Sequence, residues 1–250
     1  MSKQNNTSRV LVTGGHSRIG QAITCLLAAE GMHPCIHYRT GADRANLLAN
    51  QLMSAAGARP DTMECDLCDA DLAVATLVAA PALPWDAIVF NASAFEFDDA
   101  ANIDSALWQK MHAVHYETSV KVACAMAKRN PNVALVFILD QAVANPNRDF
   151  LSYTLSKSAL HAALPVLAVA LAPARVNAVC PGLTLPSYGQ SLDEFSAIHN
   201  ATILKRGNTA DDVARAVLFL LQSPAITGQV IFVDGGQRFT SVERDRVLTN

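Results

Sequence analysis

The sequence is poor in charged residues, which make up 16% of its 250 amino acids. The 19 basic residues are outnumbered by 22 acidic ones, and the formal net charge is -3. This balance exerts no overall attraction on a phosphate backbone, so we expect no nucleic-acid partner. Hydrophobic residues make up 51% of the chain. That content excludes a disordered chain and suits one large domain with a substantial core.

An apolar leader and a membrane-spanning run are also missing. The first residues, MSKQNNTSR, are polar, unlike the apolar core of a signal peptide. The longest apolar run, residues 159–173, is interrupted by His161 and Pro165 and is too short to cross a bilayer. We therefore predict a cytoplasmic protein that does not enter a membrane.

Metal-ligand patterns are scarce as well. Six cysteines are scattered along the chain. Cys65 and Cys68 form a single CxxC, with no second pair and no nearby histidine. A structural zinc site needs four such ligands, so no metal is expected.

Short apolar runs alternate with longer segments of helical periodicity. The apolar runs predict strands at residues 10–13, 32–38, 62–65, 86–91, 133–140, 175–179 and 230–233. The longer segments predict helices at residues 19–30, 42–55, 69–79, 104–128, 150–172 and 210–221. Strands joined through helices form right-handed crossovers. We therefore predict one α/β domain over residues 1–250: a doubly wound parallel sheet of about seven strands, with helices on both faces. Residues 1–8 and 240–250 are expected to be flexible tails.

The first predicted strand runs into TGGHSRIG, residues 13–20. Glycines at a strand-to-helix turn let the backbone approach a pyrophosphate, and the helix N-terminus offers free N–H donors. The spacing differs from GxGxxG, so a tight turn without a ligand stays an alternative. Arg18 stands where a small residue would suit the turn better. Its guanidinium is expected to reach the pyrophosphate or a polar ligand beside it.

The second predicted strand ends in His37-Tyr38-Arg39-Thr40, with no acidic residue to close it. An Arg here accommodates the 2′-phosphate of NADP, whereas a carboxylate would bind the ribose hydroxyl of NAD. Arg39 and Thr40 thus favour NADP(H), with an ordinary solvated arginine as the alternative. Asp66-Leu67, after the third strand, would either bracket an adenine or cap the next helix.

The fourth predicted strand ends in FNASAF, residues 90–95. Phe95 could offer a stacking face to a flat ring, although core packing is the alternative. His112 and His115, on the following helix, are expected to be hydrogen-bonded core residues rather than ligands. Residues 183–200, polar and turn-rich, follow Pro181-Gly182 and could form a mobile lid.

Asp140 ends the fifth predicted strand, and Tyr153 and Lys157 follow it at helical spacing. Residues four apart lie on one helix face. An ammonium beside a phenol favours the phenolate and lowers a pKa that is ordinarily about 10. Tyr153 is therefore a candidate proton donor or acceptor near neutral pH.

Five motifs in order, TGGHSRIG, FNAS, YTLSK, RVNAVCPGLT and TGQVIFVDGG, resemble those of the short-chain dehydrogenase/reductase family over essentially the whole chain. The resemblance implies a Rossmann-like fold, with Tyr153 as catalytic acid, Lys157 at the nicotinamide ribose and Asn91 supporting the cofactor. It also implies a dimer or, more often, a tetramer. Pro165 is unusual within the helix that forms the family's subunit interface.

Within the family, the sequence is similar to pteridine reductases and bacterial dihydromonapterin reductases. Those proteins also carry an Arg like Arg18, a basic loop like residues 37–40 and a pterin-stacking Phe like Phe95. They have Asp, not Ser, thirteen residues before the Tyr, as Asp140 stands here. The similarity implies NADPH-dependent reduction of a pterin-like molecule held between Phe95 and the nicotinamide.

These resemblances assign three overlapping sets of site residues. The catalytic set is Asp140, Tyr153 and Lys157. The substrate set is Arg18, Ser93, Phe95, Asp140, Tyr153 and Tyr188. The NADP(H) set is Gly14, His16, Ser17, Arg18, Ile19, Gly20, Tyr38, Arg39, Thr40, Asp66, Leu67, Asn91, Ala92, Ser93, Lys157, Pro181, Gly182 and Thr184.

The carboxylate of Asp140 favours a nitrogen-rich substrate over a simple ketone. An ionised Asp only accepts hydrogen bonds and would oppose the oxyanion that develops during carbonyl reduction. A dihydropterin presents N–H and amino donors and needs a proton on a ring nitrogen. Reduction of another small carbonyl or imine compound is one alternative. A non-catalytic NADP-binding protein is another, because His115, in AVHYET, takes the place of the family's catalytic Asn. The proton-relay water is therefore expected to be arranged differently.

Overall fold

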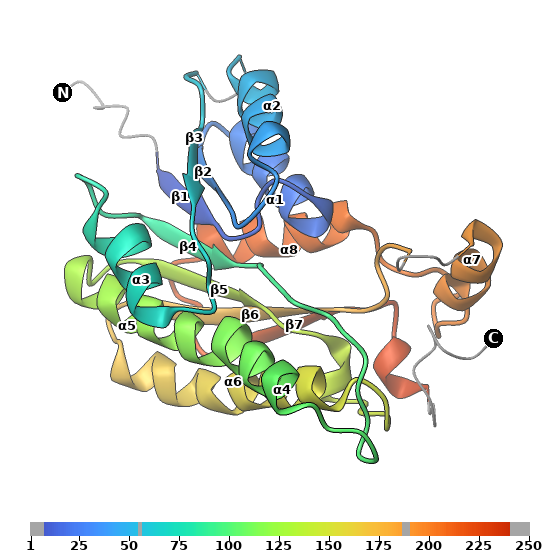
Figure 1. Ribbon diagram of the computed structural model, residues 1–250. Helices are drawn as coiled ribbons and strands as arrows, with labels where there is room; N and C mark the ends of the chain where they lie inside the picture. The colour runs from blue at the N-terminus through green and yellow to red at the C-terminus, as the bar shows by residue number, and fades with distance from the viewer. Residues whose placement is uncertain (1–7, 55–56, 187–190, 241–250) are drawn as a thin grey trace.

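The computed structural model describes residues 8–54, 57–186 and 191–240 (Figure 1). Within them, seven parallel strands form one sheet in the order β3-β2-β1-β4-β5-β6-β7. The strands are β1 (Arg9–Val12), β2 (His33–Tyr38), β3 (Asp61–Glu64), β4 (Ala87–Phe90), β5 (Ala134–Ile138), β6 (Arg175–Pro181) and β7 (Val230–Val233). The strand order reverses between β1 and β4, the place where such sheets bind ligands. The predicted fold class is confirmed.

Helices cover both faces of the sheet (Figure 1). One face carries α1 (Arg18–Ala29), α2 (Ala42–Leu52) and α8 (Ala210–Gln222). The other carries α3 (Ala70–Ala73), the π-helical turn η1 (Val74–Ala79), α4 (Ser105–His112), the π-helical turn η2 (Ala113–Glu117), α5 (Thr118–Arg129) and α6 (Leu151–Ala170). The short 3-10 turns η3 (Gln141–Val143) and η4 (Gln237–Phe239) and helix α7 (Leu192–Asn200) lie beyond the sheet's carboxyl edge.

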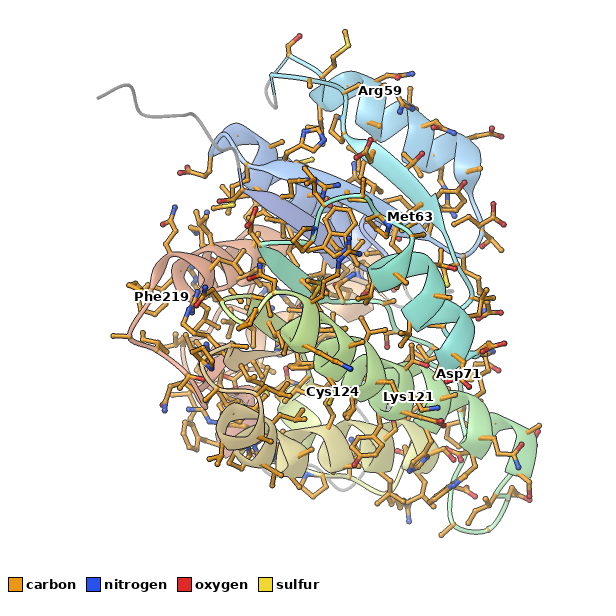
Figure 2. The ribbon with its side chains drawn as sticks, turned by 90° about the vertical axis from the view of Figure 1, so that its left-hand side faces the viewer. Arg59, Met63, Asp71, Lys121, Cys124 and Phe219 are labelled. Atoms are coloured by element: carbon orange, nitrogen blue, oxygen red, sulfur yellow. The ribbon has the colours of Figure 1, made fainter. Side chains whose placement is uncertain are left out.

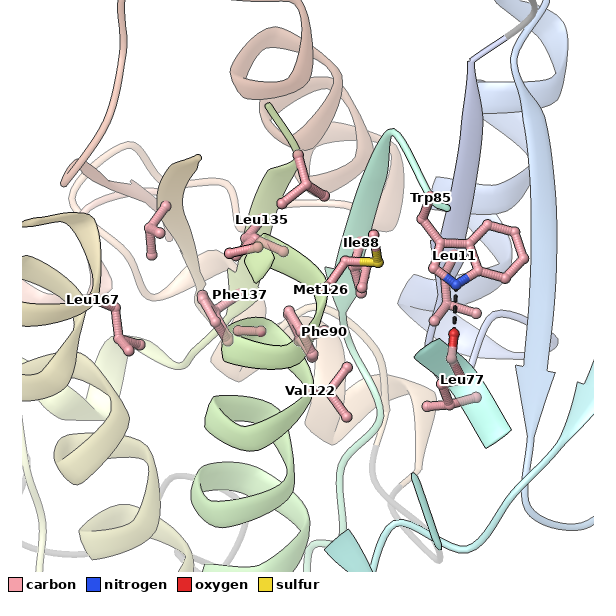
Figure 3. Close-up of a cluster of buried hydrophobic side chains, with 14 of the residues drawn as sticks. Leu11, Leu77, Trp85, Ile88, Phe90, Val122, Met126, Leu135, Phe137 and Leu167 are labelled. Carbon is pink, nitrogen blue, oxygen red and sulfur yellow. Dashed lines mark hydrogen bonds between the residues drawn. The ribbon is translucent and has the colours of Figure 1, made fainter. Parts of the chain in front are cut away.

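The two hydrophobic layers follow from the alternation of side chains along each strand. In β1, Val10 and Val12 pack in the layer under α1 and α8, whereas Leu11 packs in the layer under α5 and α6. Figure 3 shows this second layer. At its edge the Trp85 indole N–H donates to the Leu77 carbonyl at 2.6 Å. Trp85 therefore buries its ring without leaving its one donor unpaired.

Helix α5 has one buried and one exposed face. Val122 and Met126 point into the core in Figure 3, while Lys121 and Cys124 lie on the outer surface in Figure 2. The Lys121 ammonium lies 3.2 Å from the carboxylate of Asp71. Exposed ion pairs of this kind contribute about 0–1 kcal/mol. The apolar face therefore fixes the helix on the sheet.

Two helical segments differ from the sequence prediction. The single helix expected over residues 104–128 is two α-helices joined by the π-helical turn η2, which contains the buried His115. The segment expected to be a turn-rich lid contains α7. Helix α6 agrees with the helix expected over residues 150–172. It continues through Pro165, and its Val166 and Val169 are 65% and 82% exposed.

Within the described ranges, no helix combines the length and the apolar character needed to cross a bilayer. The expected tails fall outside the described residues except for Ser8 and Thr240. The Thr240 carbonyl accepts a hydrogen bond from the Asn145 side chain at 2.8 Å, which ties this end of the described chain to the loop after η3.

Candidate active site

A cavity of about 810 Å³ opens at the carboxyl ends of the central strands. Most of the residues predicted for the site line it. They are Gly14, His16, Ser17, Arg18, Ile19, Arg39, Thr40, Asp66, Leu67, Asn91, Ala92, Ser93, Phe95, Asp140, Tyr153, Lys157, Pro181, Gly182 and Thr184. The carboxyl ends of six strands, β1 to β6, therefore meet at one site, as expected for a parallel sheet.

Two predicted site residues, Tyr38 and Gly20, do not line the cavity, and a third, Tyr188, lies outside the described residues. Tyr38 is buried against Ile36 and Leu48 in the layer under α2. Gly20 lies behind the turn, where an added Cβ would come within 2.2 Å of the Gly14 carbonyl oxygen. A glycine at position 20 thus allows close packing of the turn rather than contact with a ligand.

The turn after β1 is held from below by His37. The Gly14 N–H donates to His37 Nδ1 at 3.0 Å, so the proton is on Nε2, which donates to the Cys65 carbonyl at 3.0 Å. Burial lowers the pKa of His37 to about 4. The prediction of a basic loop at residues 37–40 is therefore wrong for His37, which is neutral and supports the backbone of the turn.

Arg18 begins α1 with a left-handed backbone, at φ +53°. A side chain in this conformation costs roughly 1–2 kcal/mol, which explains why a glycine would suit the position. The guanidinium donates to the Pro186 carbonyl at 3.2 Å. Arg18 therefore links the turn after β1 to the segment after β6 across the mouth of the cavity.

The N-terminus of α1 carries no side-chain cap. Ser17, its N-cap residue, makes no capping hydrogen bond, and the first turn has no acidic residue. By contrast, Asp104 and Thr209 cap α4 and α8 through their side chains. The first backbone N–H groups of α1 are therefore left for an anion, which the macrodipole also favours.

A basic group surrounds the end of β2. Arg39 and Thr40 are exposed and line the cavity. The sequence analysis did not single out Arg44. A Cβ added at Gly41 would lie 3.0 Å from the Arg44 guanidinium and 3.4 Å from His16 Nε2, so both side chains lie close to Gly41. The pKa of His16 is lowered, first by burial and then by the charge of Arg44. The buried Nδ1 of His16 has no hydrogen-bond partner among the described residues.

Asn91 and Thr13 join the ends of β4 and β1. The Asn91 side chain donates to the Thr13 carbonyl at 3.0 Å, and Thr13 Oγ1 accepts the N–H groups of Asn91 and Ala92 at 2.8 and 2.9 Å. These bonds hold the two strand ends at a fixed separation. Asn91 therefore supports the glycine turn.

Asp140, Tyr153 and Lys157 meet on one wall of the cavity. The Tyr153 hydroxyl donates to Asp140 Oδ2 at 2.9 Å, while Oδ1 accepts the Ala142 N–H at 2.8 Å. The Lys157 ammonium donates to the Ile138 carbonyl at 2.8 Å. Burial lowers the pKa of Lys157 to about 8, against the opposing charge of Asp140. The wall thus offers a proton on a phenol, a fixed carboxylate and a buried cation.

The catalytic helix α6 is positioned by a carboxylate from a distant loop. Phe150 precedes the helix in a left-handed conformation and supplies no side-chain cap. Asp98 supplies it instead, accepting the Ser152 N–H at 3.0 Å and the Ser152 hydroxyl. Asp98 has no local sequence signal, because it lies 54 positions from Ser152.

An aromatic surface lies beside Tyr153. The Phe95 ring stacks on Phe150 at 4.1 Å and meets the Tyr153 ring edge-on at 4.8 Å. Phe95 is 46% exposed, so the core-packing alternative for this residue is wrong. A flat ring entering the cavity would find an aromatic face next to a proton donor.

Comparison with known proteins identifies the family. The family model described as enoyl-(acyl carrier protein) reductase matches residues 14–238. The uncharacterized oxidoreductase YmfI of Bacillus subtilis is 30% identical over 90% of this chain and 97% of its own length. The chain belongs to the short-chain dehydrogenase/reductase family.

Two further likenesses bear on the kind of reductase. FolM alternative dihydrofolate reductase 1 from Brucella suis, solved in complex with NADP, is 38% identical. The match covers 96% of this chain and 98% of that chain, with a TM-score of 0.88. Pteridine reductase 1 of Leishmania tarentolae is 27% identical over 92% of this chain and 96% of its own length.

His115, which the sequence resemblance places at the position of the family's catalytic Asn, is hydrogen-bonded through both ring nitrogens. The Ala94 N–H donates to Nε2 at 3.1 Å, so Nδ1 carries the proton and donates to Ser156 Oγ at 2.8 Å. Burial and the charges of Lys157 and His112 place the pKa of His115 well below its usual range. His115 is therefore a neutral core residue, as predicted, and joins the loop after β4 to α6.

Lys157 is expected to give this short-chain dehydrogenase/reductase an alkaline limb in its pH profile. Because its pKa is about 8, the ammonium predominates at neutral pH and is lost as the pH rises through that value. Loss of the cation removes its support for the phenolate, so kcat/KM should fall above about pH 8. An NMR titration of labelled lysines, with Lys157→Met for assignment, should show one lysine at about 8. A Lys157 that titrates at its ordinary 10.5 would contradict the expectation.

Proposed function

We propose that the protein is an NADPH-dependent reductase that converts a dihydropterin into its tetrahydro form. The observation that carries the proposal is the hydrogen bond from Tyr153 to Asp140, at 2.9 Å. It puts an acceptor-only carboxylate beside the proton donor, where a carbonyl reductase would need a second donor for the oxyanion. A substrate with N–H donors and a basic ring nitrogen suits this pair.

The residues around the glycine turn fit NADP(H). The uncapped first turn of α1 suits the pyrophosphate, and the group of Arg39, Thr40 and Arg44 suits a 2′-phosphate. The likeness to the NADP complex of the Brucella protein supports this assignment. When bound, NADPH supplies the hydride.

The protein's own groups supply the proton and the orientation. Tyr153 holds the proton that the ring nitrogen needs, and Lys157 stabilises the phenolate left behind. Asp140 is pinned by the Ala142 N–H and accepts from substrate N–H groups without moving. Phe95 presents its exposed face to the flat ring.

Arg39 is expected to select NADPH over NADH. Its guanidinium would bind the 2′-phosphate, so an Arg39→Ala variant should weaken NADPH about 10- to 100-fold and NADH less than about 3-fold. Cofactor fluorescence titrations give both dissociation constants. Arg59→Ala removes an arginine that bonds to Asn46 and Asn50 outside the cavity and should change neither constant. Equal weakening of both cofactors by Arg39→Ala would contradict the assignment.

Steady-state NADPH oxidation tests the proposed function. The substrates are dihydrobiopterin, dihydromonapterin and a panel of small ketones and imines. Turnover of the pterins, with much weaker turnover of the ketones, is expected. Reduction of ketones or imines while the pterins are ignored would favour a general short-chain reductase. No turnover of any of these substrates would favour a non-catalytic NADP-binding protein.

A further inference from the structure

Gln141 is a buried polar residue in the cavity wall with an unmatched acceptor. It follows Asp140 directly, opens the 3-10 turn η3, lines the cavity and is only 6% exposed. Its Oε1 is buried and has no hydrogen-bond partner among the described residues. A buried acceptor without a partner is destabilising, and native proteins rarely keep one without a reason.

Gln237 provides an internal comparison. It lines the same cavity and is 8% exposed, but its Oε1 accepts the Leu183 N–H at 2.8 Å. Its turn, η4, packs against η3. Two glutamines of similar burial thus lie close together, and one of them is satisfied by the backbone. The unmatched Oε1 of Gln141 is therefore not shared by the other buried glutamine of this cavity.

The hydrogen bonds of Asp140 fix the backbone next to Gln141. Asp140 has an extended backbone, and its two oxygens accept from the Ala142 N–H and the Tyr153 hydroxyl. Gln141 directly follows this anchored residue, so its backbone position is also defined. Its terminal amide still turns about its last side-chain bond, a torsion with broad preferences. Rotation about that bond redirects Oε1 without moving the backbone of a residue that lines the cavity.

We propose that Gln141 is a specificity-determining residue whose amide oxygen accepts an N–H or amino donor of the substrate beside the one bound by Asp140. The inference rests on the proposed function and deepens it, because two neighbouring acceptors match a ring with an amino group next to a ring N–H. A simple ketone lacks these donors and leaves Oε1 unpaired. A site built to bind a substrate N–H strongly rejects the analogue that lacks it.

The test compares Gln141→Leu with Gln237→Leu. Leu keeps most of the side-chain volume and removes the amide in both variants. Dissociation constants of dihydrobiopterin and of quinoxaline, a flat ring without the amino and N–H groups, are measured on the NADP⁺ complex. Thermal melting of each unliganded variant reports whether the deleted amide was structural.

In Gln141→Leu, the preference for dihydrobiopterin over quinoxaline should fall about tenfold or more. The variant should melt no lower than the wild type, because it loses an unsatisfied acceptor. Gln237→Leu should melt several degrees lower, roughly 2–4 °C per kcal/mol lost. An unchanged ligand preference in Gln141→Leu, or melting as low as that of Gln237→Leu, would overturn the proposal.

Failure of the proposed function gives a different pattern. A wild-type protein that neither binds nor reduces dihydrobiopterin refutes the pterin assignment of both Asp140 and Gln141. If the wild type reduces dihydrobiopterin and Gln141→Leu keeps its full preference for that ring, only the role of Gln141 is refuted.

Discussion

A Tyr153→Phe variant is expected to reduce a dihydropterin about 10²- to 10⁴-fold more slowly than the wild type. The substitution removes the only atom of the side chain that can hold a proton and leaves the ring in place beside Phe95 and His115. Because binding surfaces are kept, the loss should appear in kcat, with KM changed little. Steady-state NADPH oxidation at saturating pterin measures it.

Tyr116→Phe is the matched control for this variant. Tyr116 lies in η2, packs against the main core and does not line the cavity. Its variant should keep the wild-type kcat. A kcat for Tyr153→Phe within about tenfold of the wild type would show that another group delivers the proton.

Asp140→Ser should lower kcat/KM for the dihydropterin about 10²- to 10³-fold and lower it far less for ketones. The hydroxyl replaces an acceptor-only group with one that also donates, so it no longer matches substrate N–H groups and tolerates an oxyanion. Serine can still accept the Ala142 N–H that begins η3, so the local fold should survive. The measurement is the ratio of kcat/KM for dihydrobiopterin to that for the best ketone, in both proteins.

Two outcomes bear on the role of Asp140. A fall in the pterin-to-ketone ratio supports the view that the carboxylate binds N–H donors. Unchanged pterin kinetics in Asp140→Ser would show that the carboxylate has no part in substrate binding. A circular dichroism spectrum matching that of the wild type excludes unfolding as the cause of a loss.

Much of the fold could be predicted from the sequence because it depends on local patterns. Runs such as residues 133–139 are apolar throughout, as expected for strands buried on both faces. The topology then predicts that the segments after the strands lie close together. Arg18, Asp140 and Tyr153 all belong to such segments and were therefore expected in one place. Parallel pairing brings all carboxyl ends to the same edge.

The parts that could not be predicted depend on contacts between distant segments. Asp98 caps α6 from another loop, and Arg44 approaches His16 only after α2 has folded back. A histidine such as His37 can bind phosphate when it is protonated. Here it is neutral because the paired strands bury it, and the sequence alone does not show that burial. The π-helical turn at residues 113–117 has no periodicity signal, because one extra residue hardly alters the apolar pattern.

The central claim is that the enzyme transfers a hydride from NADPH to a dihydropterin. The most direct test uses NADPH in which deuterium replaces the hydrogen that is transferred from C4 of the nicotinamide. The wild-type enzyme is incubated with this cofactor and dihydrobiopterin, and the product is analysed by mass spectrometry and NMR. The expected result is tetrahydrobiopterin with one deuterium on a ring carbon, formed at the rate of NADPH oxidation and nearly lost in Tyr153→Phe. Unlabelled tetrahydropterin, or NADPH oxidation without any tetrahydropterin, would contradict the claim.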